Sequence, residues 1–359
     1  MAATMRAWTF TSRGTPSSVL KLRNDLPKPS PAMLGPHDVL VKVAYVAVFQ
    51  GSAAIMNIIP HFNSNLWIPE SNFSGLIEAI GRDVQHLKVG DAVFGSPNPK
   101  HYTKRETKYN GMMAEFAIIH AGQVVRKPDN IAFDAAAGLA AEGCTILQFC
   151  QKTKIKEGDR VLICGASGGL GSVAVQIAKS IVGEEGAVVG ICSAANADLV
   201  KGLGADEVVD YKSHSRLSDH LAELYSAKPF NVIMDCAGVD DSLYFESPRY
   251  LSPDGVFLAG GRMGVTHGGG GILDILSFLV VLQLRMHWPS VLGGTPRTLM
   301  FHSGEVIPES MQELPRLVEK GQLRGVIDGE WPMEDAIKAY QRVATGRARG
   351  KVVVRVQDV

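Results

Sequence analysis

Short apolar segments rich in β-branched residues recur along the first third of the chain, and turns rich in Gly and Pro separate them. One such segment covers residues 39–48 and follows a turn at 35–38. Similar segments cover 73–81, 89–95 and 113–119. Runs of this length between turn residues are typical of strands. We therefore expect a compact β-rich domain in this part of the chain.

The pattern changes after residue 130 to an alternation of helical and strand-like segments. An Ala-rich stretch over 133–152 is helical in character, although Gly138 and Gly143 interrupt it. Strands are then expected over 160–164, 187–192, 207–211 and 230–235, with helices between them over 173–182, 197–203 and 217–227. This alternation predicts an α/β fold with a parallel, doubly wound sheet.

The C-terminal segment completes this organisation. Helices are expected over 311–320 and 333–343, and a closing strand over 351–356. Because a single strand is not stable without a sheet to join, we expect this tail to return to the N-terminal β-rich domain. The predicted domains are a β-rich domain over 1–130 with 303–359, and a cofactor domain over 131–302.

The composition limits what the protein can bind. The 359 residues include 36 Lys and Arg against 36 Asp and Glu, and the pI is near 7.1. This balance leaves no basic stripe for nucleic acid and no acidic tail. The longest apolar run, 272–284, is shorter than the ~20 residues that a membrane-spanning helix needs. We expect no membrane span, and this run is expected to form a buried helix, a pocket wall or a subunit contact.

The cysteines indicate the compartment. The five of them are scattered, and no pair has Cys-x-x-Cys spacing (Cys144, Cys150, Cys164, Cys192 and Cys236). Neither a disulfide framework nor a Cys-rich zinc site is therefore expected. The first ten residues also lack the apolar core of a signal peptide. A reducing, cytoplasmic compartment is the expectation.

The segment 161–179 contains the most specific chemical signal. A buried strand leads into a glycine-rich turn that opens a helix, with Ala166, Gly168 and Gly171 at the spacing of the dinucleotide-binding fingerprint. There the central Gly lets the backbone approach the pyrophosphate, the last lets the helix pack on the strand, and the first helical amides hold the phosphates. A structural βα turn looks similar, but here the strand, the helix and further βα units are all present. The expected cofactor-binding residues of this loop are Ala166, Ser167, Gly168, Gly169, Leu170 and Gly171.

The end of the second strand of this sheet bears on which dinucleotide is bound. NAD-binding chains usually place Asp or Glu there, about 20 residues on, to bond the ribose 2′-hydroxyl. This chain has Ser193, Ala194, Ala195 and Asn196 instead. No carboxylate in this segment would repel a 2′-phosphate, and Ser193 and Asn196 could donate to it, so the sequence favours NADP(H).

Further motifs extend this pattern over nearly the whole chain. They are 38–43 (DVLVKV), 89–95 (VGDAVFG), 110–116 (NGMMAEF), 127–131 (KPDNI), 165–171 (GASGGLG), 203–211 (LGADEVVDY) and 350–354 (GKVVV). In these motifs the chain resembles the medium-chain dehydrogenase/reductase superfamily, in its zinc-free quinone oxidoreductase and enoyl reductase-like branch. The resemblance implies a GroES-like β-rich catalytic domain and a Rossmann NADP(H)-binding domain, with the active cleft between them. It also implies a homodimer, in which an open edge strand near 298–302 pairs with its partner.

Zinc is not expected. In zinc-bearing relatives a Cys follows the strand that here covers 43–48, whereas this chain has Phe49-Gln-Gly-Ser. Those relatives also have Gly-His-Glu before the strand that begins near Phe73, where this chain has Glu70-Ser-Asn. Residues 96–111 lack the cysteines of a structural zinc lobe. Without soft ligands at tetrahedral spacing, no metal site is predicted.

Contacts near the nicotinamide follow from the resemblance alone. Thr145 matches a threonine whose hydroxyl lies beside the carboxamide, and Gly260 and Gly261 match positions where the backbone passes the ring. Each has a structural alternative, because Thr145 could be an ordinary helix residue and the glycines could serve a turn.

The resemblance also suggests contacts at the adenosine phosphate. Tyr211 matches a tyrosine near that phosphate, and Arg349 or Lys351 could reach it. Their alternatives are a strand-end aromatic and solvated charges. Close relatives often carry Arg where this chain has Ala195, so another cation, such as Lys201 or Arg349, would have to replace it.

On the substrate side, the family's Val-Asn-Pro-x-Asp has become Val48-Phe-Gln-Gly-Ser. Phe49 thus replaces a polar residue that faces the substrate, which favours an apolar, ring-containing substrate. The candidate donors to a substrate carbonyl are Gln50, Ser52, His61 and Asn72. Each could instead be a surface or packing residue, and the proton could come from solvent.

The expected activity is hydride transfer from NADPH to the electron-poor carbon of a small hydrophobic enone, quinone or enoyl substrate. A donor in a dry cleft would stabilise the charge that develops on the carbonyl oxygen. The alternatives are a trans-acting enoyl reductase of a polyketide pathway and a non-catalytic NADPH-binding protein. A zinc alcohol dehydrogenase is a further alternative that the missing ligands disfavour.

Overall fold

The computed structural model describes residues 3–58, 66–98, 111–260 and 272–359, with backbone alone for Ile58 and 272–279. The chain forms two compact units. The first unit contains Met1–Cys144 and Glu305–Val359, and the second contains Thr145–Gly304. The first division falls inside helix α5 (Ala140–Thr153).

The first unit is built mainly of strands. Its strands are β1 (Thr4–Thr9), β2 (Lys21–Pro27), β3 (Asp38–Val48), β4 (Phe73–Ile80), β5 (Ala92–Gly95), β6 (Phe116–His120), β7 (Val124–Arg126), β14 (Ile327–Pro332) and β15 (Lys351–Arg355). Its helices are α1 (Pro16–Val19), α2 (Ser52–Ile58), α4 (Phe133–Ala137), α11 (Pro308–Glu319) and α12 (Ala336–Ala344).

Strand β3 organises the main sheet of this unit, whose order is β14-β15-β3-β4-β5-β7. It pairs with β4 along most of its length, with β6 through Asp38–Lys42 and with β15 through Tyr45–Val48. Most of its side chains are buried, because elements cover it on both faces. This explains why its sequence is a nearly continuous run of apolar residues rather than a strict alternation.

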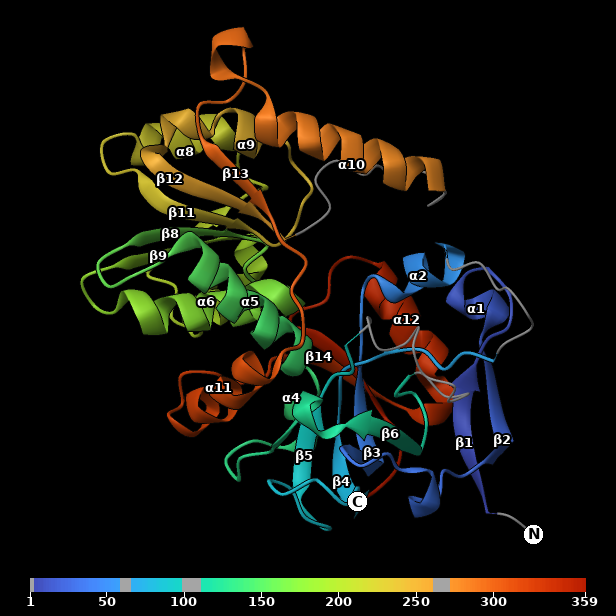
Figure 1. Cartoon of the computed structure of the whole chain (residues 1–359). Helices are drawn as coiled ribbons and strands as arrows, with labels where there is room; N and C mark the ends of the chain where they lie inside the picture. The colour runs from blue at the N-terminus through green and yellow to red at the C-terminus, as the bar shows by residue number, and fades with distance from the viewer. Residues whose placement is uncertain (1–2, 59–65, 99–110, 261–271) are drawn as a thin grey trace. The chain divides into compact units, whose positions relative to one another are not determined.

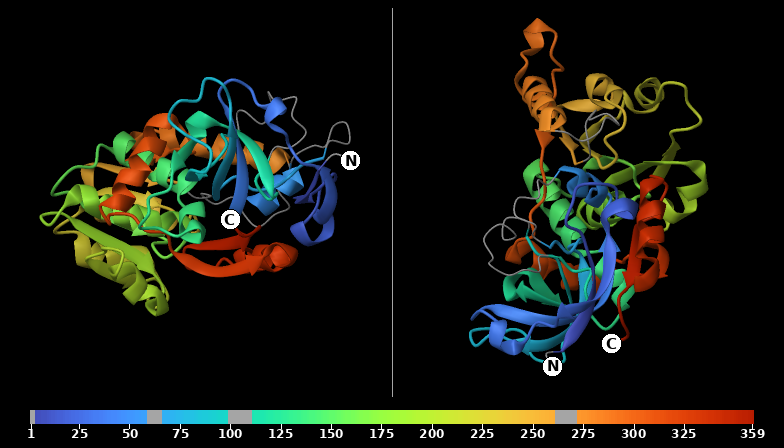
Figure 2. Two further views of the ribbon diagram at one scale, coloured as in Figure 1. Left: turned by 90° about the horizontal axis from the view of Figure 1, so that it is seen from below. Right: turned by 90° about the vertical axis from the view of Figure 1, so that its right-hand side faces the viewer.

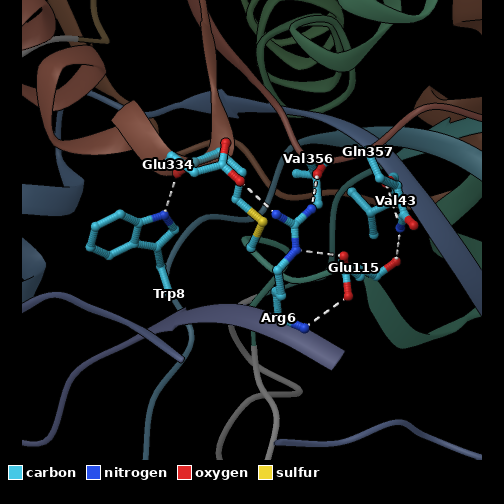
Figure 3. Close-up of polar contacts among 8 residues, drawn as sticks. Arg6, Trp8, Val43, Glu115, Glu334, Val356 and Gln357 are labelled. Atoms are coloured by element: carbon cyan, nitrogen blue, oxygen red, sulfur yellow. Dashed lines mark hydrogen bonds and ion pairs between the residues drawn. The ribbon is translucent and has the colours of Figure 1, made fainter. Parts of the chain in front are cut away.

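The two ends of the chain meet in this unit (Figure 3). Arg6 of β1 donates to Glu115 at 2.8 Å and to Glu334 at 2.5 Å. The indole Nε1 of Trp8 donates to the carbonyl of Met333 at 2.7 Å. In the C-terminal tail, the Gln357 amide donates to the carbonyls of Val43 and Glu115. The closing strand β15 thus joins the N-terminal sheet, and side chains from β1 reinforce that junction.

The second unit alternates strands and helices. Its strands are β8 (Arg160–Cys164), β9 (Ala187–Cys192), β10 (Glu207–Asp210), β11 (Phe230–Asp235), β12 (Leu251–Ala259) and β13 (Thr298–Phe301). Its helices, besides most of α5, are α6 (Gly169–Val182), α7 (Ala197–Lys201), α8 (Leu217–Tyr225), α9 (Ser242–Phe245) and α10 (Ile272–His287).

The described strands of this unit form one parallel sheet in the order β10-β9-β8-β11-β12-β13. In chain order this is 3-2-1-4-5-6, the order of the doubly wound dinucleotide-binding fold. The chain reverses direction across the sheet between β8 and β11, which is where such folds bind their ligand. The predicted α/β class with a β-rich domain is confirmed.

Helices cover both faces of this sheet (Figure 1). On one face, Leu221 of α8, Tyr244 of α9 and Leu282 of α10 join a core cluster with Leu162 and Phe257 of the strands. On the other face, α6 packs on β8 and β9. Because the strands are all parallel, their C-terminal ends lie at one edge of the sheet.

The predicted apolar run 272–284 lies in α10, of which the described side chains begin at Val280. Leu282 is buried against the sheet, whereas Val280 is 59% exposed and Leu284 is 50% exposed. The segment after α10 projects from the rest of this unit, with Ser290–Leu292 near its tip (Figure 2). No helix in the described part of the chain is long and apolar enough to cross a membrane.

Candidate functional site

The glycine-rich loop lies at the C-terminal end of β8, beside the point where the sheet reverses. Gly165 has φ +72°, a left-handed conformation that favours glycine. The Gly168 N–H donates to the Gly165 carbonyl at 2.9 Å, and helix α6 begins at the next residue. A Cβ at Gly171 would lie 2.1 Å from the Gly165 carbonyl oxygen, so only glycine allows the helix to approach the strand this closely. The loop therefore has the geometry that the fingerprint predicts.

This loop fits the diphosphate of a dinucleotide. A Cβ at Gly168 would have the Gly165 carbonyl, at 3.4 Å, as its nearest neighbour, so space is open above this backbone. Gly169, Leu170 and Gly171 form the first turn of α6, and N–H groups of a first helical turn have no partner within their helix. Those groups and the helix dipole together favour an anion. Ala166 is fully buried, so it can contribute only through its backbone.

Three other predicted cofactor residues lie at the same edge of the sheet. Strands β9 and β10 pair so that Cys192 is opposite Asp210. The Tyr211 N–H donates to the Cys192 carbonyl at 3.3 Å, which places Tyr211 beside Ser193. The Asn196 amide donates to the Ser167 hydroxyl at 2.9 Å and so connects this segment to the glycine-rich loop. The structure thus brings Ser167, Asn196 and Tyr211 together at the ends of three neighbouring strands.

Asp210 is a carboxylate at this edge that the sequence analysis did not consider. It accepts from the Lys212 N–H at 2.9 Å and from the Ser213 hydroxyl at 2.8 Å. These bonds, with a further one from the Ala194 backbone, hold the pKa of Asp210 below its usual range. The carboxylate is therefore ionised near neutral pH. The motif Val-Val-Asp-Tyr contains this carboxylate directly before Tyr211.

The predicted nicotinamide-side residues lie on α5 and after β12. Thr145 is packed by Gly304, where a Cβ would lie 2.1 Å from the Thr145 hydroxyl oxygen. The Gly260 N–H donates to the Asp235 carbonyl at 2.9 Å, and a Cβ on Gly260 would lie 2.5 Å from the Phe149 ring. Packing against Phe149 therefore favours glycine at position 260, independently of any contact with the nicotinamide. Gly261 lies outside the described residues.

His302 is a second group that the sequence analysis missed. It follows β13, beside the end of β12, and its Nε2 lies 2.8 Å from the Gln148 side-chain oxygen. Its ring also meets Phe149 edge-on, with centroids 6.1 Å apart. No sequence motif distinguishes His302 from the other histidines.

On the substrate side, the turn Phe49–Ser52 connects β3 to α2. Gln50 is exposed and Phe49 is 47% exposed. A Cβ on Gly51 would lie 2.3 Å from the Phe49 ring, so the ring lies directly over this glycine. Ser52 is buried and its side chain bonds the carboxyl group of Glu70. Among the predicted donors that the structure describes, only Gln50 is exposed. His61 lies outside the described residues.

Asn72 and Lys351 belong to one buried polar network. The Asn72 amide donates to Glu142 Oε2 at 2.8 Å, and its oxygen accepts from the Ala141 N–H at 3.0 Å. The Lys351 ammonium lies 2.5 Å from Glu142 Oε1, and both side chains are less than a tenth exposed. These contacts give both residues a structural role. Asn72 is a hydrogen-bond donor to Glu142, and Lys351 is the counter-ion of Glu142. They argue against the predicted contacts of Asn72 with substrate and of Lys351 with phosphate.

Arg349 is exposed on the segment before β15, and its backbone N–H donates to Asp328 at 2.9 Å. Its predicted contact with a 2′-phosphate remains a prediction.

The described residues at the positions of the zinc ligands do not fit a zinc ion. Phe49–Ser52 and Glu70–Asn72, which occupy the positions of zinc ligands in the metal-bearing relatives, supply no thiolate and no imidazole. Within the described ranges there is no group of three His, Cys, Asp or Glu side chains that could hold a metal. Cys144 is buried, and burial raises its pKa to about 12, so it is a protonated thiol at neutral pH.

Comparisons with known families cover both units. Residues 35–129 match the model of the alcohol dehydrogenase GroES-like domain, and residues 203–354 match the model described as zinc-binding dehydrogenase. The second description names a zinc-binding family, whereas the part of the chain that the structure describes holds no cluster of three metal-binding side chains.

Similar curated proteins match the chain from end to end. The trans-enoyl reductase poxH of Penicillium oxalicum is 34% identical, covering 99% of this chain and 98% of its own length. The medium chain reductase pydE of an Acremonium species is also 34% identical, over 99% of this chain and 100% of its own. Among solved structures, the quinone oxidoreductase from Coxiella burnetii superposes with a TM-score of 0.76 at 23% identity, covering 99% and 100% of the two chains.

Proposed function

Because the chain belongs to the medium-chain dehydrogenase/reductase superfamily, we propose that it is an NADPH-dependent reductase of conjugated enoyl, enone or quinone substrates. The family makes the chain an oxidoreductase whose Rossmann-type domain binds NAD(P). The preference for NADPH over NADH and the class of substrate are our proposal. The observation that supports it most is the joint presence of a dinucleotide loop and the end-to-end similarity to proteins named trans-enoyl reductases.

The preference for NADPH is supported by the segment after β9. Ser193 and Asn196 offer donors there and no carboxylate. Asp210 opposes this preference, since its negative charge lies beside the same segment. Lys212, whose ammonium lies 5.9 Å from the Tyr211 ring, is a nearby cation that offsets part of that charge. We propose that Ser193, Tyr211 and Lys212 together hold the 2′-phosphate, while Asn196 holds the loop.

When bound, the dinucleotide supplies the hydride. The protein's part is to orient it through the glycine-rich loop and the first turn of α6, and to exclude water. We propose that Phe49 contacts the apolar part of the substrate. Gln50 is the favoured donor to the carbonyl oxygen, because Ser52 and Asn72 are engaged with Glu70 and Glu142. The proton that completes the reduction comes from solvent.

We also propose that this reaction needs no zinc. The charge on the carbonyl oxygen would then be stabilised by hydrogen-bond donors rather than by a Lewis acid. Metal analysis of the purified protein, with activity measured before and after chelation, tests this. One zinc per chain together with loss of activity on chelation would refute it.

The first experiment compares NADPH with NADH by intrinsic fluorescence titration and then follows oxidation with quinones, simple enones and enoyl thioesters. We expect tighter binding of NADPH and oxidation with at least one of these classes. Preference for NADH would show that Asp210 outweighs Ser193 and Lys212. Tight binding without turnover on every class would refute the reductase proposal and support a non-catalytic NADPH-binding protein.

A second candidate is a trans-acting enoyl reductase of a polyketide pathway. It is favoured by the printed names of several relatives, among them poxH of Penicillium oxalicum and pgmF of Aspergillus terreus. Activity on enoyl thioesters held on a carrier domain, with none on free quinones, would favour it. Equal activity on free quinones and simple enones would favour a general reductase.

We propose that the protein is a cytoplasmic homodimer. Strand β13 is the last strand in the order of the described sheet, and an unpaired edge is a ready site for a two-fold partner. All five cysteines are free, which suits a reducing compartment. Sedimentation at micromolar concentration tests the dimer, and a monomer at all concentrations would refute it.

A further inference from the structure

Glu70 has an unusual backbone conformation for its residue type. Two non-glycine residues in the described chain have positive φ, namely Glu70 at +65° and Lys154 at +55°. Lys154 is exposed just after the end of α5, where a left-handed residue is an ordinary helix cap. Glu70 is instead buried, at 8% exposure, in the segment that leads into β4. A buried, left-handed glutamate is strained and persists only where its surroundings impose it.

The surroundings of Glu70 impose that conformation through the backbone. The Met112 N–H donates to the Glu70 carbonyl at 3.0 Å, and the Met113 N–H donates to the Pro69 carbonyl at 3.1 Å. A Cβ on Gly111 would lie only 2.0 Å from the Ile68 carbonyl oxygen. The two segments therefore cross at the closest approach that a glycine permits, and this fixes the direction of the Glu70 side chain.

That side chain accepts hydrogen bonds from three different elements. Its Oε2 accepts from the Phe49 N–H at 2.9 Å, and its Oε1 accepts from the Tyr340 hydroxyl of α12 at 2.7 Å. The Ser52 side chain, at the start of α2, bonds it as well. Phe49 and Ser52 are the two ends of the turn that follows β3. One carboxyl group thus holds both ends of this turn and connects it to α12.

We propose that Glu70 is a positioning residue that fixes the Phe49–Ser52 turn and thereby sets which substrates the protein accepts. The substrate part of this inference rests on the proposed function. Glu70 does not contact the reacting atoms, because its oxygens are occupied by these three donors in the protein interior. It acts through Phe49, whose ring lies over Gly51, and through Gln50, which is exposed beside it.

Burial raises the pKa of the Glu70 carboxyl group, whereas the hydrogen bonds from Tyr340, Phe49 and Ser52 favour its ionised form, which only accepts hydrogen bonds. The Glu70→Gln variant keeps the size of the side chain but turns one acceptor into an N–H donor. The Tyr340 hydroxyl can rotate to accept from that amide, while the remaining amide oxygen still accepts from the Phe49 N–H. Glu70→Gln should therefore keep the turn in place, whereas Glu70→Gly removes all three bonds and should release it.

The first test is amide hydrogen exchange of the full-length protein, which needs no substrate. In Glu70→Gly we expect peptides covering the Phe49–Ser52 turn to exchange at least about tenfold faster, as follows from losing buried hydrogen bonds, whereas in Glu70→Gln they should exchange much as in wild type. Tyr340→Phe should raise the amide exchange rate of the turn less, because the hydrogen bonds from Phe49 and Ser52 to Glu70 remain. Glu78→Gln is the matched control, since Glu78 on β4 pairs with Lys28 away from the turn. Unchanged exchange of the turn in Glu70→Gly would overturn the proposal.

The second test separates positioning from general stability. Glu70→Gly removes the carboxylate but relieves the left-handed backbone, which offsets part of the lost hydrogen-bond energy. For Glu70→Gly we expect kcat/KM to fall about tenfold, and unequally for small and large enoyl substrates, with NADPH affinity unchanged, while Glu70→Gln should keep most of the activity. An equal loss for all substrates that follows the fall in Tm would assign Glu70 a structural role and refute the proposal. If wild type reduces no substrate, the proposed function fails, while hydrogen exchange still decides whether Glu70 fixes the turn.

Discussion

The glycine-rich loop after β8 and the turn after β3 are both connections at the end of a buried strand, yet they are held in different ways. The loop is shaped by its own residues, since Gly165 turns it and Gly171 admits the helix. The turn depends on Glu70 and Tyr340, and the latter is 270 residues further along the chain. A site of the first kind is encoded in a short motif. A site of the second kind exists only after the fold has assembled.

This difference predicts how each region responds to change. Substitutions in the loop should affect cofactor binding and little else, whereas remote substitutions that loosen the first unit should affect the turn.

The largest effect is expected from Lys351→Met. It leaves the Glu142 carboxylate buried without its counter-ion, which costs about 3–5 kcal/mol in comparable pairs. We expect this loss in the free energy of unfolding, measured by urea denaturation. Lys338→Met, which removes an exposed pair with Asp335, is the control and should change stability by less than about 1 kcal/mol. Similar values for the two variants would show that the buried network is not a main support of the first unit.

Gly168→Ala tests the locally encoded region. The new methyl group has room, with its nearest neighbour at 3.4 Å, so Tm should be unchanged. It occupies the space above the backbone where the diphosphate is expected, and affinity for NADPH should fall about 10–100-fold. Fluorescence titration measures this, and Ser180→Ala at the far end of α6 is the control. Normal affinity in Gly168→Ala would place the cofactor elsewhere.

Asp210→Asn sharpens the account of cofactor choice. Removing one negative charge beside the segment after β9 should raise the preference for NADPH over NADH by about two- to fivefold, because the charge is exposed and screened. The ratio of the two dissociation constants is the measurement, at low and at high salt. A fall in the ratio would mean that Asp210 orders the binding segment through its bonds to Lys212 and Ser213 rather than repelling phosphate.

The smallest effect expected is the loss of stability at low pH from the Asp328–Arg342 ion pair. Asp328 of β14 bonds Arg342 of α12 through both carboxylate oxygens, and these bonds hold the pKa of Asp328 below its usual range. Because the folded pKa is lowered, the pair contributes stability above about pH 4, and this contribution is lost as the pH falls through the folded pKa. It should amount to about 0.5–1 kcal/mol, since Arg342 is partly exposed.

Asp328→Asn should therefore destabilise the protein near neutral pH and have little effect at pH 2–3. Thermal unfolding across this range, compared with wild type, measures the difference. Since α12 also carries Tyr340, acid should loosen the turn before it affects the loop. A pH-independent difference between the two proteins would contradict this assignment.

The same contrast explains what could be predicted from the sequence. The parallel sheet was predicted because each of its strands is an apolar run bounded by turns, and β8, β9 and β11 match the expected ranges. Helix α6 begins at Gly169 rather than at 173, because glycines are poor helix formers and hide the first turn. The Ala-rich run at 133–152 is two helices, α4 and α5, of which α4 packs on β3 and β4.

Features that depend on remote partners were not predictable in this way. Strands β1 and β14 have mixed, partly exposed sequences, and their pairing depends on neighbours far along the chain. Asn72 was expected to face substrate because polar residues near a cleft usually do, but Glu142 and Ala141 occupy its amide. The motif Glu70-Ser-Asn bears on the absence of zinc ligands, but nothing in it reveals a left-handed backbone or a partner in α12.

The pairing of β3 with β15 has a consequence for biosynthesis. Val48 is opposite Val352, so the first sheet stays incomplete until almost the entire polypeptide has left the ribosome. The second unit is continuous in sequence and has mostly neighbouring connections, so we expect it to fold while translation proceeds. Limited proteolysis of nascent chains stalled after Gly304 should then find a protected second unit and a digestible N-terminal segment. The order in which the two units mature would be the reverse of the order in which they are synthesised.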